Sequence, residues 1–241
     1  MHLSQVKNIV EEIRSCSQKC YHEEYQGELA ALSKCGPLID TAQESKTILF
    51  ISQAPSRQAM KDGVLSVHEN KFFTDTLLKR LFAYTNKKEL EGLVRGWQEK
   101  VFWIHTANCY PGRAKNDRND EPPNMKCSNT FMARFINAFE PQLIVLMSQA
   151  AIKIFSGSIK KNLSLPGSGY PALRDTLRAQ REFHQKNGAD FQVNKKGKGD
   201  QGIASFPCIA ISHLASHPST EDQLYAVDYL ARRLRKEFDL S

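Results

Sequence analysis

The sequence predicts an α/β protein in which helices cover both faces of a central, mainly parallel four-stranded sheet, a three-layer α/β/α arrangement. Two observations lead to this fold class. Four continuous apolar runs have the length and composition of buried strands, and helical patterns fill the segments between them. Polar residues follow three of the runs, at what would be the carboxyl edge of a parallel sheet, where ligands bind.

The four strands are expected in chain order as follows. The first spans 47–52 and is stopped by the turn residues Ala54-Pro55-Ser56. The second spans 101–107 and ends just before Cys109. The third, 143–147, begins after a proline, and the fourth, 208–212, leads into a polar loop.

Helices are predicted from apolar residues at helical spacing. In the first helix these residues are Leu3, Val6, Ile9, Val10 and Ile13. Further helices are expected at 72–84, 87–98, 124–138, 149–155, 172–185 and 220–238. The charged stretch 113–123 and the Gly/Lys-rich stretch 186–202 are expected to be irregular. With no repeat or linker, we expect one domain over 1–241, with 1–46 as an N-terminal helical segment.

Composition narrows the class of protein. With 41% hydrophobic and 24% charged residues among 241, a packed core is expected and wholesale disorder is excluded. The net charge of +7 fits a polyanionic partner, and equally fits ordinary solvated lysines. No apolar run reaches the roughly 18–20 residues of a membrane span, and residues 1–14 do not form a signal-peptide core. We therefore expect a cytoplasmic protein whose six cysteines are metal ligands or buried thiols.

Several short motifs are weak evidence of function singly but more specific when their order along the chain is considered. Ser52-Gln-Ala-Pro-Ser56 and His217-Pro-Ser219 are weak singly, since a proline turn and a helix start explain them. Between them lie Asn70–Leu78, Cys109-Tyr-Pro-Gly-Arg113 and Phe139–Ala151. Together these segments resemble the uracil-DNA glycosylase superfamily, in particular its iron–sulfur (family 4/5-like) branch, with divergent active-site motifs. The resemblance runs from Cys16 to about Ser219.

The resemblance implies roles for individual residues. A glycosylase flips a base out of the stack and holds it against an aromatic plate, here Phe72 or Phe73, which would otherwise be core residues of a helix. His217 would stabilise the departing base. The remaining implied contacts are Ala54 with the base, and Ser56, Arg113, Pro218 and Ser219 with DNA.

Two positions depart from the family pattern near the reaction centre. Gln53 stands where an acidic residue usually orients the attacking water, and an amide can position water but cannot take its proton. Asp62 resembles a nearby acidic position and is a candidate to compensate, although a turn aspartate before glycine explains it as well. Either the enzyme relies on stabilising the leaving base and the sugar cation, or it has lost activity.

Base recognition is the second departure. His105 stands where the uracil-reading asparagine usually lies, and Asn108 takes that place only in a shifted register. Neutral histidine offers one donor and one acceptor, unlike an amide. Serine replaces glycine at Ser52 and Ser56, which indicates a reshaped pocket. The base is uracil or, given these changes, a modified cytosine of the kind phages carry, which would make the protein a phage-defence enzyme.

The cysteines suggest a cofactor through the same resemblance. Cys16, Cys20, Cys109 and Cys127 match the four ligands of a [4Fe–4S] cluster, although the first pair is separated by three residues where the family usually has two. Cys35 is a possible substitute ligand. Zinc or no metal are the alternatives, and Cys208 within a strand is expected to be a buried thiol.

The sequence therefore predicts a monomeric, monofunctional DNA glycosylase of base-excision repair type, since no lysine occupies a motif position where it would form a Schiff base. It would hydrolyse the N-glycosidic bond of a pyrimidine and leave an abasic site. A catalytically inactive nucleic-acid-binding module of the same fold is the alternative, favoured by Gln53. A nucleoside-processing enzyme is a third possibility.

Overall fold

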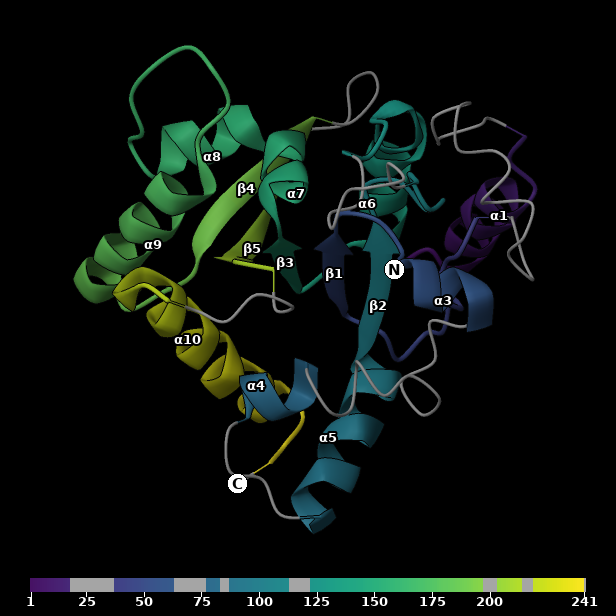
Figure 1. Ribbon diagram of the computed structural model, residues 1–241, viewed down its shortest axis with the longest axis horizontal. Helices are drawn as coiled ribbons and strands as arrows, with labels where there is room; N and C mark the ends of the chain where they lie inside the picture. Colours follow the sequence, from purple (N-terminus) through teal and green to yellow (C-terminus); the bar gives the residue numbers. More distant parts are fainter. Residues whose placement is uncertain are drawn as a thin grey trace.

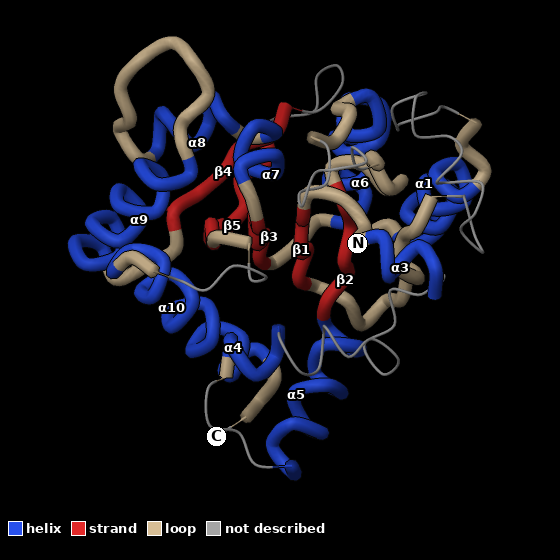
Figure 2. The backbone as a smooth tube through the Cα atoms, in the orientation of Figure 1, coloured by secondary structure: helices blue, strands red, loops and turns tan. Residues whose placement is uncertain are grey.

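The fold was analysed in a computed structural model that describes residues 1–17, 37–62, 77–82, 87–112, 122–196, 203–213 and 219–240. Within these residues the strands are β1 (Ile48–Ser52), β2 (Val101–His105), β3 (Leu143–Met147), β4 (Phe191–Lys196) and β5 (Ile203–Ile211). They form one sheet in the order β2-β1-β3-β5-β4 (Figures 1 and 2). Four strands are parallel, and β4 pairs antiparallel with β5.

The α/β class is confirmed, but the predicted four-stranded sheet is wrong because β4 adds a fifth strand. This strand lies in a stretch expected to be irregular. Phe191 and Val193 are fully buried while Gln192 and Asn194 are half-buried, so burial alternates along β4 as expected for a strand. With only two apolar residues, the alternation is too short to be recognised in the sequence. Polar and lysine-rich sequence is usual for an edge strand, which must resist pairing with other chains.

β5 begins earlier than predicted, at Ile203. Its pairing with β3 starts at Cys208, so residues 203–207 have only β4 as a strand neighbour. Proline has no N–H to donate, and Pro207 is tolerated there because this part of β5 makes no ladder with β3 that it could interrupt. β2 ends at His105 and not at residue 107, since the N–H groups of Thr106 and Ala107 turn to the carbonyls of Ser52 and Gln53.

The helices, in chain order, are α1 (Leu3–Arg14), α3 (Arg57–Asp62), α4 (Lys79–Leu81), α5 (Lys87–Lys100), the π-helix η3 (Ser128–Met132), α6 (Ala133–Phe139), α7 (Gln149–Ile154), α8 (Ser156–Asn162), α9 (Leu173–Asn187) and α10 (Glu221–Glu237). α3 and α8 were not predicted from the sequence. None of the described helices has the length and apolar character to cross a membrane.

Helices pack on both faces of the sheet. On one face Phe102 of β2 contacts Phe135 and Phe139 of α6, with ring centroids 4.8 and 5.6 Å away. On the other face Trp103 lies against Trp97 of α5, at 6.4 Å. β1, β2 and β3 are buried along their whole length, so the core forms on both sides of the sheet.

The outer side of β2 is closed by a carboxylate. Asp40 accepts a hydrogen bond from the backbone N–H of Trp103 at 3.1 Å. The same carboxylate oxygen binds the Lys46 ammonium at 2.7 Å, and Lys46 is buried. Since β2 is the last strand on this side, Asp40 occupies the place that a further strand would take.

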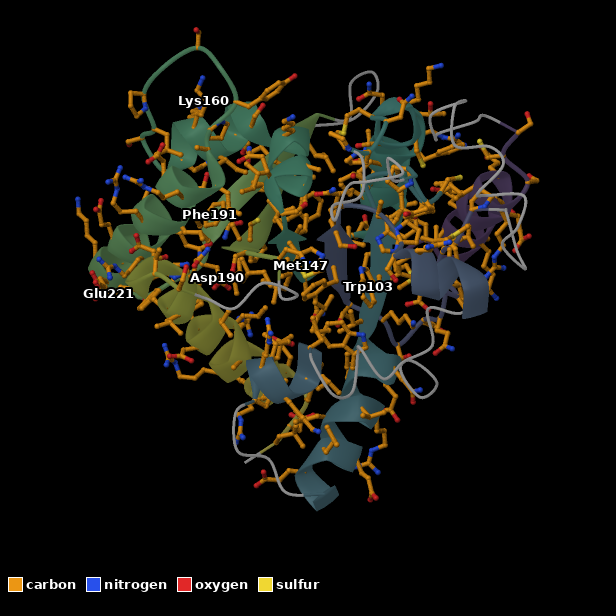
Figure 3. The ribbon with its side chains drawn as sticks, viewed as in Figure 1. Trp103, Met147, Lys160, Asp190, Phe191 and Glu221 are labelled. Carbon is orange, nitrogen blue, oxygen red and sulfur yellow. The ribbon has the colours of Figure 1, made fainter. Side chains whose placement is uncertain are left out.

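α9 and α10 are tied to the opposite half of the sheet. The buried Gln180 amide donates to the Ala210 carbonyl at 3.0 Å and accepts from the Ala210 N–H at 2.6 Å. His184 stacks on Tyr229 of α10 at 3.9 Å. The Tyr229 hydroxyl donates to Asp190 at 2.8 Å. Asp190 lies next to Phe191, the first residue of β4 (Figure 3). The two Gln180 hydrogen bonds hold Ala210 near the end of β5, from which the chain continues to His213.

Candidate functional site

Polar residues gather where β1 and β2 end. The strand-terminal residues Ser52 and His105 are register partners, so they project from the same face of the sheet. β3 ends in parallel beside β1 at Met147, and the arrowheads of the three strands point to one end of the molecule (Figure 1). We call this end, defined by Ser52, His105 and Met147, the carboxyl edge. It is the edge at which open α/β sheets bind ligands.

Three buried side chains are linked at the carboxyl edge. The Trp103 indole Nε1–H donates to the Ser52 hydroxyl at 2.7 Å, and the same hydroxyl lies 2.5 Å from His105 Nδ1. Trp103 sits two residues before His105 on β2, which places both on one face. Ser52 and His105 are each 2% exposed. The second ring nitrogen of His105, Nε2, is buried and has no partner among the described residues.

His105 is a neutral side chain at ordinary pH. Burial, reinforced by the nearby His213, lowers its pKa from 6.5 to about 3. His213 follows β5 closely and is exposed. The ends of β2 and β5 therefore face a shared region of the carboxyl edge, and His105 acts there as a hydrogen-bonding group and not as a cation.

The segment after β1 is pinned to the segment after β2. The Gln53 carbonyl accepts from the Thr106 hydroxyl at 2.5 Å and from the Ala107 N–H at 3.2 Å. Gln53 and Ala54 are half-buried, and no hydrogen bond to the Gln53 side-chain amide is found within the described part of the chain. The backbone of Gln53 is thus held at the carboxyl edge by the segment that follows β2.

Ser56 and Asn108 have structural partners. Ser56 accepts a hydrogen bond from Ala59 N–H at 3.1 Å and so caps the short α3. Asn108 is buried; its side-chain carbonyl accepts from the His105 N–H at 3.1 Å, and its amide donates to Cys127 Sγ at 3.3 Å. Both ends of the Asn108 amide are engaged inside the protein, whereas His105 keeps one nitrogen without a partner.

The cysteines predicted as cluster ligands are partly within the described residues. Cys109 and Cys127 are buried and Cys16 is half-buried. No three His, Cys, Asp or Glu side chains in the described ranges gather in a group that could hold a metal ion. Cys20 and Cys35 lie outside those ranges, so the described thiols do not by themselves form the site and no chemical step is assigned to a cluster.

Other predicted residues are placed in part or not at all. Ser219 is exposed, and its N–H and hydroxyl both donate to the Gln223 side-chain carbonyl, at 2.8 and 3.3 Å. Asp62 ends α3, but its side chain is not described. Phe72, Phe73, Arg113, His217 and Pro218 lie outside the described residues.

A sequence model of the uracil DNA glycosylase superfamily matches residues 39–232, which is about four fifths of the chain. The chain belongs to the uracil DNA glycosylase superfamily. No curated protein gives a match. Enzymes of this superfamily act on DNA by hydrolysing N-glycosidic bonds, and the matched region contains the carboxyl edge with Gln53 and His105.

Two residues linked to His105 at the carboxyl edge are not among the site residues predicted from the sequence. Trp103 looks like an ordinary strand aromatic, and only its spacing of two from His105 signals a shared face. The sequence indicates that Ser52 replaces a glycine and reshapes a pocket; the structure adds that its hydroxyl joins Trp103 to His105. His213 precedes the His217 motif and has no motif of its own.

Proposed function

We propose that the protein is a monofunctional DNA glycosylase that flips a pyrimidine out of DNA and hydrolyses its N-glycosidic bond, leaving an abasic site. The observation that carries this proposal is the buried His105 at the carboxyl edge, whose Nε2 has no partner among the described residues. The next residue, Thr106, holds the backbone carbonyl of Gln53. A buried polar atom without a partner costs about 1–3 kcal/mol, and a ligand that meets it recovers that cost.

The described residues support a division of roles. Gln53 orients the water that adds to C1′ of the sugar, since its backbone is held by Thr106 and Ala107. His105 contacts the edge of the flipped base. The C1′–N bond breaks with its electron pair on the base, and the water's proton reaches the released base through solvent, because an amide cannot accept it.

The other predicted residues, several of which lie outside the described ranges, complete the proposal. Phe72 or Phe73 stacks on the flipped base, and His217 stabilises the negative charge that develops on it as it leaves. Asp62 is a second candidate for orienting water. Arg113, Pro218 and Ser219 contact the DNA backbone, and Ser56 remains a candidate contact in addition to capping α3.

The substrate is proposed to be uracil or a modified cytosine, including the hypermodified bases of phage DNA, which would give the enzyme a role in phage defence. We further propose that it acts as a monomer and binds a [4Fe–4S] cluster through Cys16, Cys20, Cys109 and Cys127. A bound cluster would hold the N-terminal segment to the loops that follow β2. Iron and sulfide analysis of anaerobically purified protein tests this: the absence of both would refute the cluster.

The function is tested by base release. Purified protein is incubated with DNA containing uracil, thymine mispairs, hydroxymethylcytosine or glucosylated hydroxymethylcytosine, and free bases are identified by mass spectrometry. We expect release of one of these bases by the native chain and loss of release in His217→Ala. Gln142→Leu, at an exposed position away from the carboxyl edge, is the matched control and should release base normally.

Gln53 favours a second candidate function, a nucleic-acid-binding module that has lost catalysis, because no carboxylate occupies that position. This alternative predicts DNA binding without base release by the native chain, and base release after Gln53→Glu. Turnover of free nucleosides without a need for DNA would refute both candidates.

A further inference from the structure

A serine and a tryptophan determine which nitrogen of His105 carries the proton. The indole N–H is a donor only, so the Ser52 hydroxyl must accept from Trp103. The hydroxyl has one proton to donate, and His105 Nδ1 at 2.5 Å is the one remaining partner found for it in the described part of the chain. If Nδ1 instead carried a proton, the Ser52 oxygen would accept two hydrogen bonds and its own proton would have no partner among those residues. The arrangement that satisfies every donor makes Nδ1 the acceptor.

The proton of the neutral ring then lies on Nε2. Neutral imidazole has one N–H and one lone-pair nitrogen, so accepting at Nδ1 leaves Nε2 as a donor. Protonation of both nitrogens is opposed by burial and by His213, which hold the pKa of His105 near 3. Nε2 is the nitrogen that is buried without a partner, so the unfilled hydrogen-bonding position at the carboxyl edge is a donor.

The Trp103 side chain, which donates to Ser52, is held in place by its neighbours. Trp103 packs on Phe50 and Trp97 with ring centroids 6.3 and 6.4 Å away. Its backbone N–H is held by Asp40 at 3.1 Å. The indole therefore has little freedom to turn away from Ser52, and the direction of the hydrogen bonds from Trp103 to Ser52 to His105 is fixed before any ligand arrives.

We propose that Ser52 and Trp103 are positioning residues that lock His105 as an Nε2–H donor, and that this donor faces ring N3 of the flipped base, so that the site selects pyrimidines that present an acceptor there. The inference rests on the proposed function and deepens it. An amide side chain can accept from the N3–H of uracil while donating to its neighbouring carbonyl, but a locked Nε2–H cannot accept. Cytosine-type bases carry a lone pair at N3, so they complement a donor that faces N3, whereas the N3–H of uracil opposes it. A carbonyl oxygen of uracil would accept from Nε2–H only in a different seating of the base, and equal binding of the two bases would reveal that seating.

The lock is tested directly by ¹⁵N NMR of histidine-labelled full-length protein at neutral pH, with the His105 signals identified by their loss in His105→Gln. We expect the shift of an unprotonated nitrogen at Nδ1 and of a protonated nitrogen at Nε2. Ser52→Ala should move both shifts toward a mixture of tautomers, and Ser52→Thr, which keeps the hydroxyl, should restore them. A proton on Nδ1 in the native chain would overturn the lock.

Selection is tested by binding two DNA duplexes that differ at one nucleotide, 2′-fluoroarabinocytidine or 2′-fluoroarabinouridine, whose glycosidic bonds resist hydrolysis. We expect the native chain to prefer the cytosine duplex by about tenfold, the equivalent of about 1.4 kcal/mol. Ser52→Ala should lose most of this preference, and Gln142→Leu, at an exposed position before the start of β3, should keep it. Equal affinity of the native chain for both duplexes would overturn the selection.

The two measurements separate the failure of this inference from that of the proposed function. Histidine shifts report the tautomer whether or not the protein cleaves DNA. Correct shifts with no binding to either duplex would overturn base selection and also count against a DNA glycosylase. Binding with the opposite preference would overturn the inference while leaving the glycosylase proposal in place.

Discussion

Replacing Gln180 by leucine should destabilise the protein through two backbone groups that the mutation does not touch. The Gln180 amide is the partner of both the N–H and the carbonyl of Ala210, at 2.6 and 3.0 Å, and both residues are fully buried. Leucine is close to glutamine in volume, so it fills the space but offers neither a donor nor an acceptor.

The magnitude follows from those two groups. Leaving a buried donor or acceptor without a partner costs about 1–3 kcal/mol each, and the added apolar burial of leucine returns at most about 1–2 kcal/mol. We therefore expect Gln180→Leu to lower the free energy of unfolding by about 1–4 kcal/mol. Gln142→Leu makes the same chemical change at an exposed position and should stay within about 0.5 kcal/mol of the native chain.

The assay is urea unfolding followed by circular dichroism at fixed temperature, with the midpoint and slope of each variant compared. A loss below about 0.5 kcal/mol in Gln180→Leu, with an unchanged slope, would show that the strand end does not depend on this amide. Because Ala210 lies shortly before His213, the same variant should also weaken base release if the proposed function is correct.

Three further outcomes are expected. Burial lowers the pKa of His184 from 6.5 to about 4. As the pH falls below about 6.5, His184 therefore binds a proton in the unfolded chain but not in the folded chain, and the free energy of unfolding decreases. His184→Phe, which keeps the stack on Tyr229, should lose less stability between about pH 7 and about pH 5 in urea titrations; equal losses would contradict this. Thr220→Ala removes the side-chain acceptor of the capping box with Gln223 and should lower thermal stability by about 1 kcal/mol, while Thr220→Ser should not. Cys208 is buried, and burial together with Asp190 raises the pKa of its thiol, so iodoacetamide should label it only in urea; mass spectrometry showing labelling of Cys208 in the native protein would refute that burial.

Much of the fold was predictable because a strand that is buried on both faces has a continuous run of apolar residues in its sequence. The run at 143–147 matches β3 at both ends, since every residue there is buried and no polar residue blurs the pattern. β4 escaped detection because a one-sided edge strand needs only Phe191 and Val193 to be apolar. In sequence, the lysines of this segment look the same as those of a loop.

The candidate site was predictable in position but less so in connectivity. Gln53 and His105 follow from where the strands end, because parallel strands bring their carboxyl ends together. The partnership of Ser52 with Trp103 depends on which residues of two strands lie in register, and register is a property of the assembled sheet. Likewise, the choice between His105 and Asn108 depends on a contact between Asn108 and Cys127, nineteen positions apart in the chain.

The carboxylate of Asp40 on the outer side of β2 has a consequence for how molecules of this protein meet one another. An incoming strand from a second chain would need the Trp103 N–H as its first anchor, and that group is already held by Asp40. Displacing Asp40 would also strip the buried Lys46 of its counter-ion. The edge of β2 is thus guarded against the strand-to-strand stacking that begins aggregation, and an Asp40→Ala variant is where such association would first be sought.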